Sequence, residues 1–118
     1  MKKLTAVLSA SVLAVSWGSA FAACEYPSKV DIPNGAEASK DEMVAGSKAI
    51  KGYMETMNTY LDCIAEESKS AAAEGESAEV TKERELLLAK RHNAAVDEME
   101  GLAAEFNVQV RAYKAKGE

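Results

Sequence analysis

Apolar residues recur along most of this chain at the spacing of an amphipathic helix. Between residues 39 and 73 they fall in steps of three and four, an interval that places side chains on one helix face. Ser39-x-x-Glu42 is a capping box that marks where such a helix begins. The pattern predicts a helix over residues 39–73, with Gly46 and Gly52 small enough for a neighbour to approach closely. The predicted stripe comprises Met43, Gly46, Ile50, Tyr53, Met57, Tyr60, Leu61 and Ile64.

A second stripe predicts a second helix over residues 78–115. Gly75 is a plausible end for the first helix and Ser77 a plausible N-cap for the next. Because the link is so short, the second helix is expected to fold back antiparallel to the first. The expected fold is therefore all-α, an antiparallel two-helix hairpin within residues 39–118. The second stripe comprises Leu88, His92, Ala95, Val96, Met99, Leu102, Ala103, Phe106, Val110 and Tyr113.

Residues 23–38, which precede the hairpin, do not have a helical pattern. Pro27 and Pro33 each remove a backbone donor and favour extended geometry in the preceding residue. Asn34-Gly35 is a turn signal. This segment is predicted to be an extended strap that ends in a turn before the first helix.

Residues 1–22 have the pattern of a secretory signal peptide. Lys2 and Lys3 precede an apolar run over residues 4–15, and Ala20-Phe21-Ala22 is a small-x-small cleavage pattern. The predicted cut lies between Ala22 and Ala23. The apolar run is too short for a permanent membrane span. We therefore expect a periplasmic or secreted protein without a membrane span.

Export changes the interpretation of the two cysteines, Cys24 and Cys63. In an oxidising compartment their default state is a disulfide. Cys63 lies about 36 Å along the first helix from its start, and an extended strap of this length can cover up to about 50 Å. The bond is thus possible only if the strap runs back along the first helix, where Tyr26, Val30 and Ile32 would cover apolar surface.

Two alternatives to this disulfide stay open from the sequence. Phe21-Ala22-Ala23-Cys24 is similar to a bacterial lipobox, in which the cysteine becomes a lipidated first residue of an outer-membrane lipoprotein. Phe stands where Leu is usual, and Cys63 would lose its partner. The other alternative is a free or intermolecular thiol.

Net charge argues against two classes of partner. Lys2 and Lys3 leave with the signal peptide, so 12 basic and 19 acidic residues remain and the net charge is −7. An acidic surface repels nucleic acid and anionic lipid headgroups. Glu66, Glu67, Glu74, Glu76, Glu79, Glu83 and Glu85 gather near the hairpin tip, which is expected to be solvated and frayed.

Few residues carry candidate chemistry. His92 is the only histidine, and with Met54 and Met57 it could form a soft-metal site. A metal site normally needs three or four ligands, and methionines at helical spacing usually fill a core. His92 is therefore interpreted as a hydrogen-bonded structural residue that faces inward or lies at the edge of the stripe. No cofactor fingerprint, hydrolase elbow or metal triad is found, so neither an enzyme nor a cofactor is predicted.

Short motifs along the chain resemble those of a family of small exported helical proteins of Gram-negative bacteria to which no activity is assigned. The resemblance implies a periplasmic setting and transfers no catalytic or ligand residue. The motifs are Cys24-x-x-Pro27, Ile32-Pro33-x-Gly35, Tyr60-x-x-Cys63, His92-Asn93-x-Ala95-Val96-Asp97, Phe106-Asn107 and Tyr113-Lys114.

The function expected from the sequence is a non-catalytic structural or protein-interaction module in the periplasm. A two-helix hairpin leaves the flanks of its apolar stripes poorly covered, so it needs the strap, a second copy or an unknown protein partner. The alternative is a periplasmic binder of a ligand or soft metal that uses His92 and the methionines.

Overall fold

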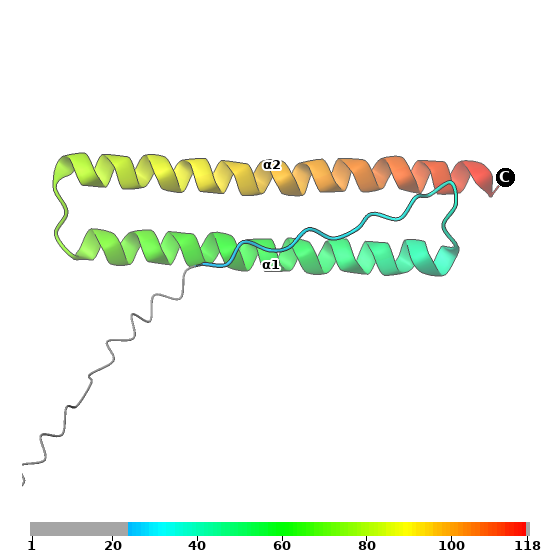
Figure 1. Cartoon of the computed structure of the whole chain (residues 1–118), viewed down its shortest axis with the longest axis horizontal. Helices are drawn as coiled ribbons and strands as arrows, with labels where there is room; N and C mark the ends of the chain where they lie inside the picture. The colour runs from blue at the N-terminus through cyan, green and yellow to red at the C-terminus, as the bar shows by residue number, and fades with distance from the viewer. Residues whose placement is uncertain (1–23, 118) are drawn as a thin grey trace, which may run out of the picture.

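The computed structural model describes residues 24–117 and consists of two long helices and a strap. Helix α1 spans Lys40–Ala73 and helix α2 spans Ala78–Lys116, and the two run antiparallel over nearly their whole length (Figure 1). The predicted all-α hairpin is therefore confirmed. The predicted signal peptide and the cleavage site between Ala22 and Ala23 lie outside the described residues.

Both helices begin at the caps that the sequence predicted. The Ser39 hydroxyl accepts from the Glu42 backbone N–H at 3.2 Å, and the Glu42 carboxylate accepts from the Ser39 N–H at 2.6 Å. The hydrogen bond from Ser39 N–H to the charged carboxylate holds the pKa of Glu42 below its ordinary value. The Ser77 hydroxyl accepts from Val80 N–H in the same way at α2. Between the helices, Gly75 has a φ of +79°, which a residue with a side chain rarely adopts.

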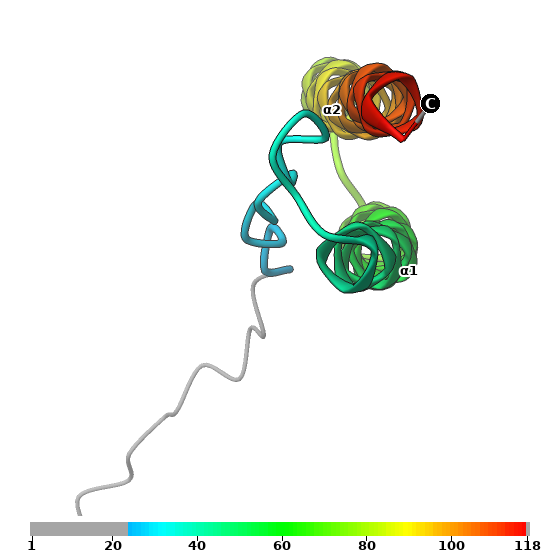
Figure 2. The same cartoon turned by 90° about the vertical axis from the view of Figure 1, so that its right-hand side faces the viewer.

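The strap occupies the third position beside the helix pair. It starts beside Cys63 in the C-terminal half of α1, runs back along the hairpin and reaches α2 close to its C-terminus before turning into α1 (Figures 1 and 2). The turn is built on Asn34, whose backbone carbonyl accepts from Ala38 N–H at 2.8 Å. The Gly35 N–H donates to Gln109 Oε1 at 2.8 Å, and Lys116 donates to the Ala38 carbonyl. These contacts anchor the turn to α2.

The core follows the predicted stripe of α1 closely. Met57 and Ile64 have relative exposures of 0% and 1%, and the strap adds Tyr26, whose ring packs edge-on against Tyr60 at a centroid distance of 5.0 Å. Val30 packs on the same cluster. Every stripe position of α1 is buried except Leu61, which is half-buried: the buried ones are Met43, Gly46, Ile50, Tyr53, Met57, Tyr60 and Ile64.

Helix α2 is covered less completely than α1. Ala95 is its only buried residue among those described, and the other apolar stripe positions are half-buried. Of the two positions expected for His92, the inward one is wrong, because His92 is exposed. Arg91 and Ala95 lie one helical turn apart on the face that meets α1, and His92 lies a further 100° around the helix. The half-buried positions are Leu88, Val96, Met99, Leu102, Ala103, Phe106, Val110 and Tyr113.

A disulfide joins the strap to α1, as predicted. Cys24 and Cys63 are bonded, with their Cα atoms 5.7 Å apart. Lipidation would use the same Cys24 sulfur, so the lipid anchor and this bond exclude each other. Because the bond closes a loop between residues 39 positions apart, it removes chain entropy from the unfolded state worth about 4 kcal/mol.

Two glycines allow the strap to lie close to the helices. A Cβ on Gly35 would stand 1.8 Å from the Gln109 carbonyl oxygen, and one on Gly46 would stand 2.7 Å from the Pro33 ring. The expected close approach at Gly46 is thus confirmed. At Gly52 it is wrong, since no atom lies within 4 Å of a Cβ placed there.

We predict opposite effects of alanine at these glycines. Gly35→Ala and Gly46→Ala should each destabilise the protein by about 1–3 kcal/mol, because the strap has to move away from the helices. Gly52→Ala is the matched control and should stabilise the protein by up to about 1 kcal/mol, since alanine favours a helix. Urea unfolding followed by circular dichroism measures both, and similar effects at all three sites would contradict the packing described.

Removing the disulfide should weaken the fold strongly. The double variant Cys24→Ser, Cys63→Ser is expected to lose up to about 4 kcal/mol of unfolding free energy. Urea titrations of the wild type with and without reductant should reproduce this loss. Mass spectrometry of protein isolated from cells provides the control: two free thiols or a lipid adduct on Cys24 would show that the bond does not form there.

Candidate functional site

The structure does not assemble the residues that the sequence offered as a soft-metal site. His92 is exposed, Met54 is half-buried, and Met57 is fully enclosed in the core. Across residues 24–117, no group of three or more His, Cys, Asp or Glu residues is placed to hold a metal ion. Met57 therefore serves as core packing, as methionines at this spacing usually do.

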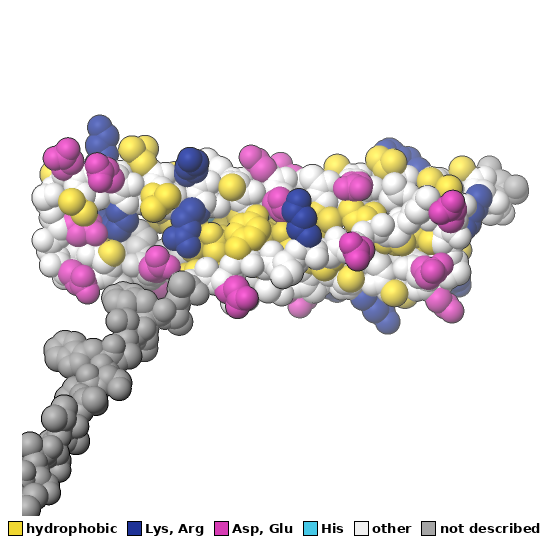
Figure 3. Space-filling view, viewed as in Figure 1, with side chains coloured by type: hydrophobic (Ala, Val, Ile, Leu, Met, Phe, Trp, Pro, Cys, Tyr) yellow, Lys and Arg dark blue, Asp and Glu magenta, His cyan; other side chains and the backbone are white. Residues whose placement is uncertain are grey.

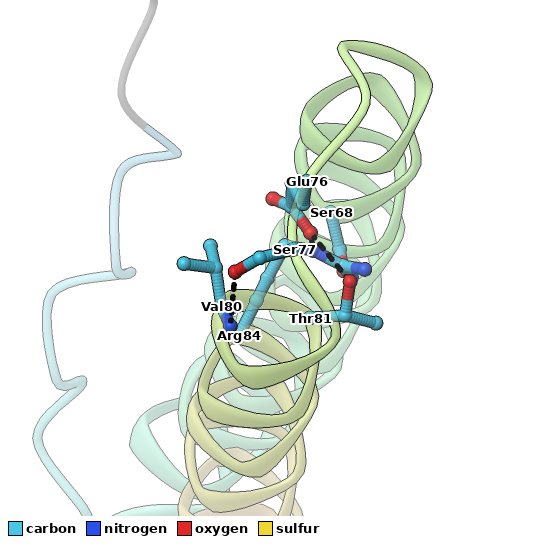
Figure 4. A network of polar contacts seen from close by, with 6 residues as sticks. All are labelled: Ser68, Glu76, Ser77, Val80, Thr81 and Arg84. Carbon is cyan, nitrogen blue, oxygen red and sulfur yellow. Dashed lines mark hydrogen bonds and ion pairs between the residues drawn. The ribbon is translucent and has the colours of Figure 1, made fainter.

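The hairpin tip is more ordered than the sequence indicated. Arg84 of α2 donates to Glu76 of the link at 2.8 Å and to the Ser68 hydroxyl of α1 at 2.5 Å (Figure 4). Thr81 donates to the same Glu76 carboxylate at 3.2 Å. The Arg84 and Glu76 side chains are only 18% and 14% exposed. The expectation of a frayed tip is therefore wrong, because one arginine joins both helices and their link. The expectation of a solvated tip is confirmed for the other glutamates of the cluster, which are exposed: Glu66, Glu67, Glu74, Glu79, Glu83 and Glu85.

We predict that this network stabilises the tip far more than an exposed ion pair does. Arg84→Met leaves the Glu76 carboxylate with only the Thr81 hydroxyl as a partner and removes the arginine bond to the buried Ser68 hydroxyl, so it should cost about 1–3 kcal/mol. Lys69→Met is the control: it removes the exposed Lys69–Glu66 pair and should cost less than about 1 kcal/mol. Urea unfolding measures both. Equal losses would mean that the Arg84 network contributes no more than an exposed ion pair.

A second cluster lies beside the disulfide. Arg91 Nε donates to the Tyr60 hydroxyl at 3.2 Å, and its guanidinium lies 5.7 Å from the centre of that ring. The Glu67 carboxylate forms an ion pair with the same guanidinium, in which Glu67 Oε1 lies 3.5 Å from Arg91 Nη1. The hydrogen bond to Tyr60 raises the pKa of Arg91 above its ordinary value. Each group here has a partner within the protein, so the cluster is structural.

A groove opens between the strap and α2. Its volume is about 610 Å³, and strap residues 29–32 form one wall. The opposite wall is the face of α2 that carries Ala94, Gly101 and Leu102, with Tyr53 of α1 between the walls. On this side of the molecule, acidic side chains flank an apolar band (Figure 3). Four acidic residues line the groove: Asp31, Asp97, Glu98 and Glu105.

Tyr53 is the unusual residue of this groove. Its side chain is 4% exposed, and its hydroxyl has no hydrogen-bond partner among the described residues. Burial raises the pKa of Tyr53 to about 12, and the nearby Tyr26 and Glu98 side chains raise it further. Neither side chain lies in hydrogen-bond geometry to the Tyr53 hydroxyl. The sequence placed Tyr53 in an apolar stripe. A hydroxyl in an apolar stripe is a sequence signal, because a buried hydroxyl needs a hydrogen-bond partner. Only the fold shows that no partner lies in hydrogen-bond geometry.

The side of the helix pair away from the strap has a different character. Residues two apart in a helix lie 200° apart, so Val96 and Ala103 lie opposite the groove-lining Ala94 and Gly101. In α1, Leu61 lies opposite Cys63, which is bonded to the strap, by the same geometry. End-on, no other described segment covers this side (Figure 2). We call this surface the open seam, and its half-buried apolar residues are Met54, Leu61, Ala65, Val96, Ala103 and Val110.

Comparison with known protein families, curated proteins and solved structures found no match to this chain. Within the described residues 24–117, neither helix has an apolar stretch sufficient for a membrane crossing.

Proposed function

We propose that this protein is a non-catalytic protein-interaction module that is exported to the periplasm and docks a helix on its open seam. The observation that carries the proposal is the spacing of apolar residues on that surface. Val96, Ala103 and Val110 are seven residues apart in α2, and Met54 and Leu61 are seven apart in α1. A seven-residue apolar repeat is the pattern by which helices pack side by side.

The degree of burial supports docking. The seam residues are half-buried rather than exposed, since each lies on the flank of the α1–α2 contact. An added helix would complete their burial and turn the two-helix layer into a bundle. The strap already supplies this cover on the opposite side, where Tyr26 and Val30 pack on the core.

Export is proposed from the signal-peptide pattern of residues 1–22 and is consistent with the Cys24–Cys63 bond. Disulfides persist in oxidising compartments and are rare in the cytosol. The resemblance to small exported proteins of Gram-negative bacteria points to the same compartment. The docked helix is supplied by a second copy of the chain or by another envelope protein.

A neighbouring pair of alanines in α2 provides the test. Ala103 is half-buried on the open seam, whereas Ala104 is exposed 100° further around the helix. A photo-crosslinking residue at position 103 should give a specific adduct in cells, with itself or with one partner, and the same residue at 104 should not. Ala103→Glu should abolish the interaction, because docking would bury a carboxylate, while Ala104→Glu leaves it intact.

Circular dichroism distinguishes a variant that no longer docks from one that no longer folds. Both glutamate variants should keep the helical circular dichroism spectrum of the wild type. Light scattering over a range of concentrations then distinguishes self-association from a foreign partner. A protein that stays monomeric and crosslinks equally from positions 103 and 104 would refute the proposed docking surface.

A further inference from the structure

The open seam has a pattern along α2 that is symmetric about its own centre. Ala89 is exposed on the same face of α2 and extends the seam toward the hairpin tip, so alanine and valine alternate at intervals of seven residues: Ala89, Val96, Ala103 and Val110. The centre of this row lies between residues 99 and 100. A second α2 that runs antiparallel across this centre places each valine opposite an alanine of the second copy. Large and small side chains that alternate in this way interdigitate well between helices.

Two exposed charges continue the same symmetry. Glu85 and Lys114 lie at equal distances on either side of this centre, and each lies within about 20° of Ala103 around the helix. Among the described residues, neither of them forms an ion pair. An antiparallel second copy places Glu85 against Lys114 of that copy, and two-fold symmetry makes the pair occur twice. The seam is therefore complementary in charge to itself.

Helix α1 is consistent with the same axis. The hydrogen bond from Arg84 to Ser68 sets the register of the two helices, so the centre in α2 faces residues 52–53 of α1. Lys51 and Glu55 are exposed on either side of this point, at the outer rim of the seam. The same antiparallel copy places Lys51 beside Glu55 of the second copy, again with opposite charges. One two-fold axis thus fits the charges of both helices.

The seam is also large enough for a stable dimer. From Glu85 to Lys114 it extends about 44 Å, at 1.5 Å per residue. Two packed helices are about 20 Å wide. The footprint is therefore roughly 800 Å² per copy, which is the size of a standard protein interface. Such an interface would complete the burial of Met54, Leu61 and Val96, which are half-buried in the single chain.

We propose that the helix docked on the open seam belongs to a second copy of this chain. Two hairpins stack seam to seam and antiparallel, with α2 on α2 and α1 on α1, and form a four-helix bundle with a strap on each outer face. This inference rests on the proposed docking surface and identifies its partner. The self-complementary charges favour a second copy over a different envelope protein, because an unrelated helix would have to match the same spacing.

Charge reversals test the register of the dimer. Sedimentation equilibrium of the purified, oxidised protein at low ionic strength should give the mass of two chains. Glu85→Lys and Lys114→Glu should each raise the dissociation constant of the dimer by about 10-fold, because each turns two attractive pairs into two repulsive ones. An equimolar mixture of the two variants should restore the dimer, since opposite charges then face each other at both positions.

Glu83→Lys is the matched control for overall charge. Glu83 is also exposed, but it lies 200° around α2 from Glu85 and so faces away from the seam. This variant should leave the dissociation constant unchanged. Glu85→Lys lowers the net negative charge of the chain, so general repulsion alone would predict a tighter dimer rather than a weaker one. Melting temperatures show that each variant is folded.

Crosslinking determines which helices stack. A photo-crosslinking residue at position 103 should give a band of twice the chain mass. Mass spectrometry of that band should locate the adduct on α2 of the second copy, near Val96. Adducts on α1 instead would mean that α2 stacks on α1, and would overturn the antiparallel arrangement of like helices.

This proposal and the proposed docking surface fail separately. A monomeric protein that gives one specific adduct from position 103 with a different envelope protein would refute the second copy and leave the docking surface in place. A mixture of Glu85→Lys and Lys114→Glu that associates no better than either variant alone would refute the dimer register. Equal adducts from positions 103 and 104 of a monomer would refute both proposals.

Discussion

The structure depends on holding the strap against the helix pair. The Cys24–Cys63 bond anchors the start of the strap on α1, and the Asn34 turn anchors its end where Gly35 donates to Gln109 of α2. Between these points the strap covers the core on one side of the hairpin. Two helices alone have no third layer to bury their apolar flanks. The strap supplies that layer on one side and leaves the opposite side open.

This one-sided cover gives the molecule two different surfaces. The strap side holds a groove, because an extended chain bridges α1 and α2 without filling the space between them. Acidic side chains line that groove. The open seam has apolar residues in a heptad spacing and suits the packing of another helix. A docking role on the open seam requires no catalytic group and agrees with the few reactive side chains in the sequence.

The α1 half of the fold could be predicted closely because its apolar spacing is regular and its caps are explicit. The two predicted N-caps, Ser39 and Ser77, both cap their helices. The link just after α1 contains Gly75, which has a positive φ, as expected of a glycine at this place. Helix α2 was predicted less well. Its apolar residues spread around more of its circumference, so the stripe did not determine which position would face α1. The exposed His92 and the inward Arg91 follow from that ambiguity.

The sequence by itself determined the secondary structure and the order of the elements, because these depend on local spacing, and it showed that the strap is long enough for Cys24 to reach Cys63. The tertiary structure was needed to show that the two cysteines are bonded. Only the tertiary structure decided which carboxylates have partners. Glu76 meets Arg84 at the tip, whereas Asp97 and Glu105 line a groove without a cation. The same holds for the Tyr53 hydroxyl, whose lack of a partner follows from contacts between segments far apart in the chain. Charge pairing and burial depend on distances of a few ångströms in space, which residue spacing within one helix does not specify.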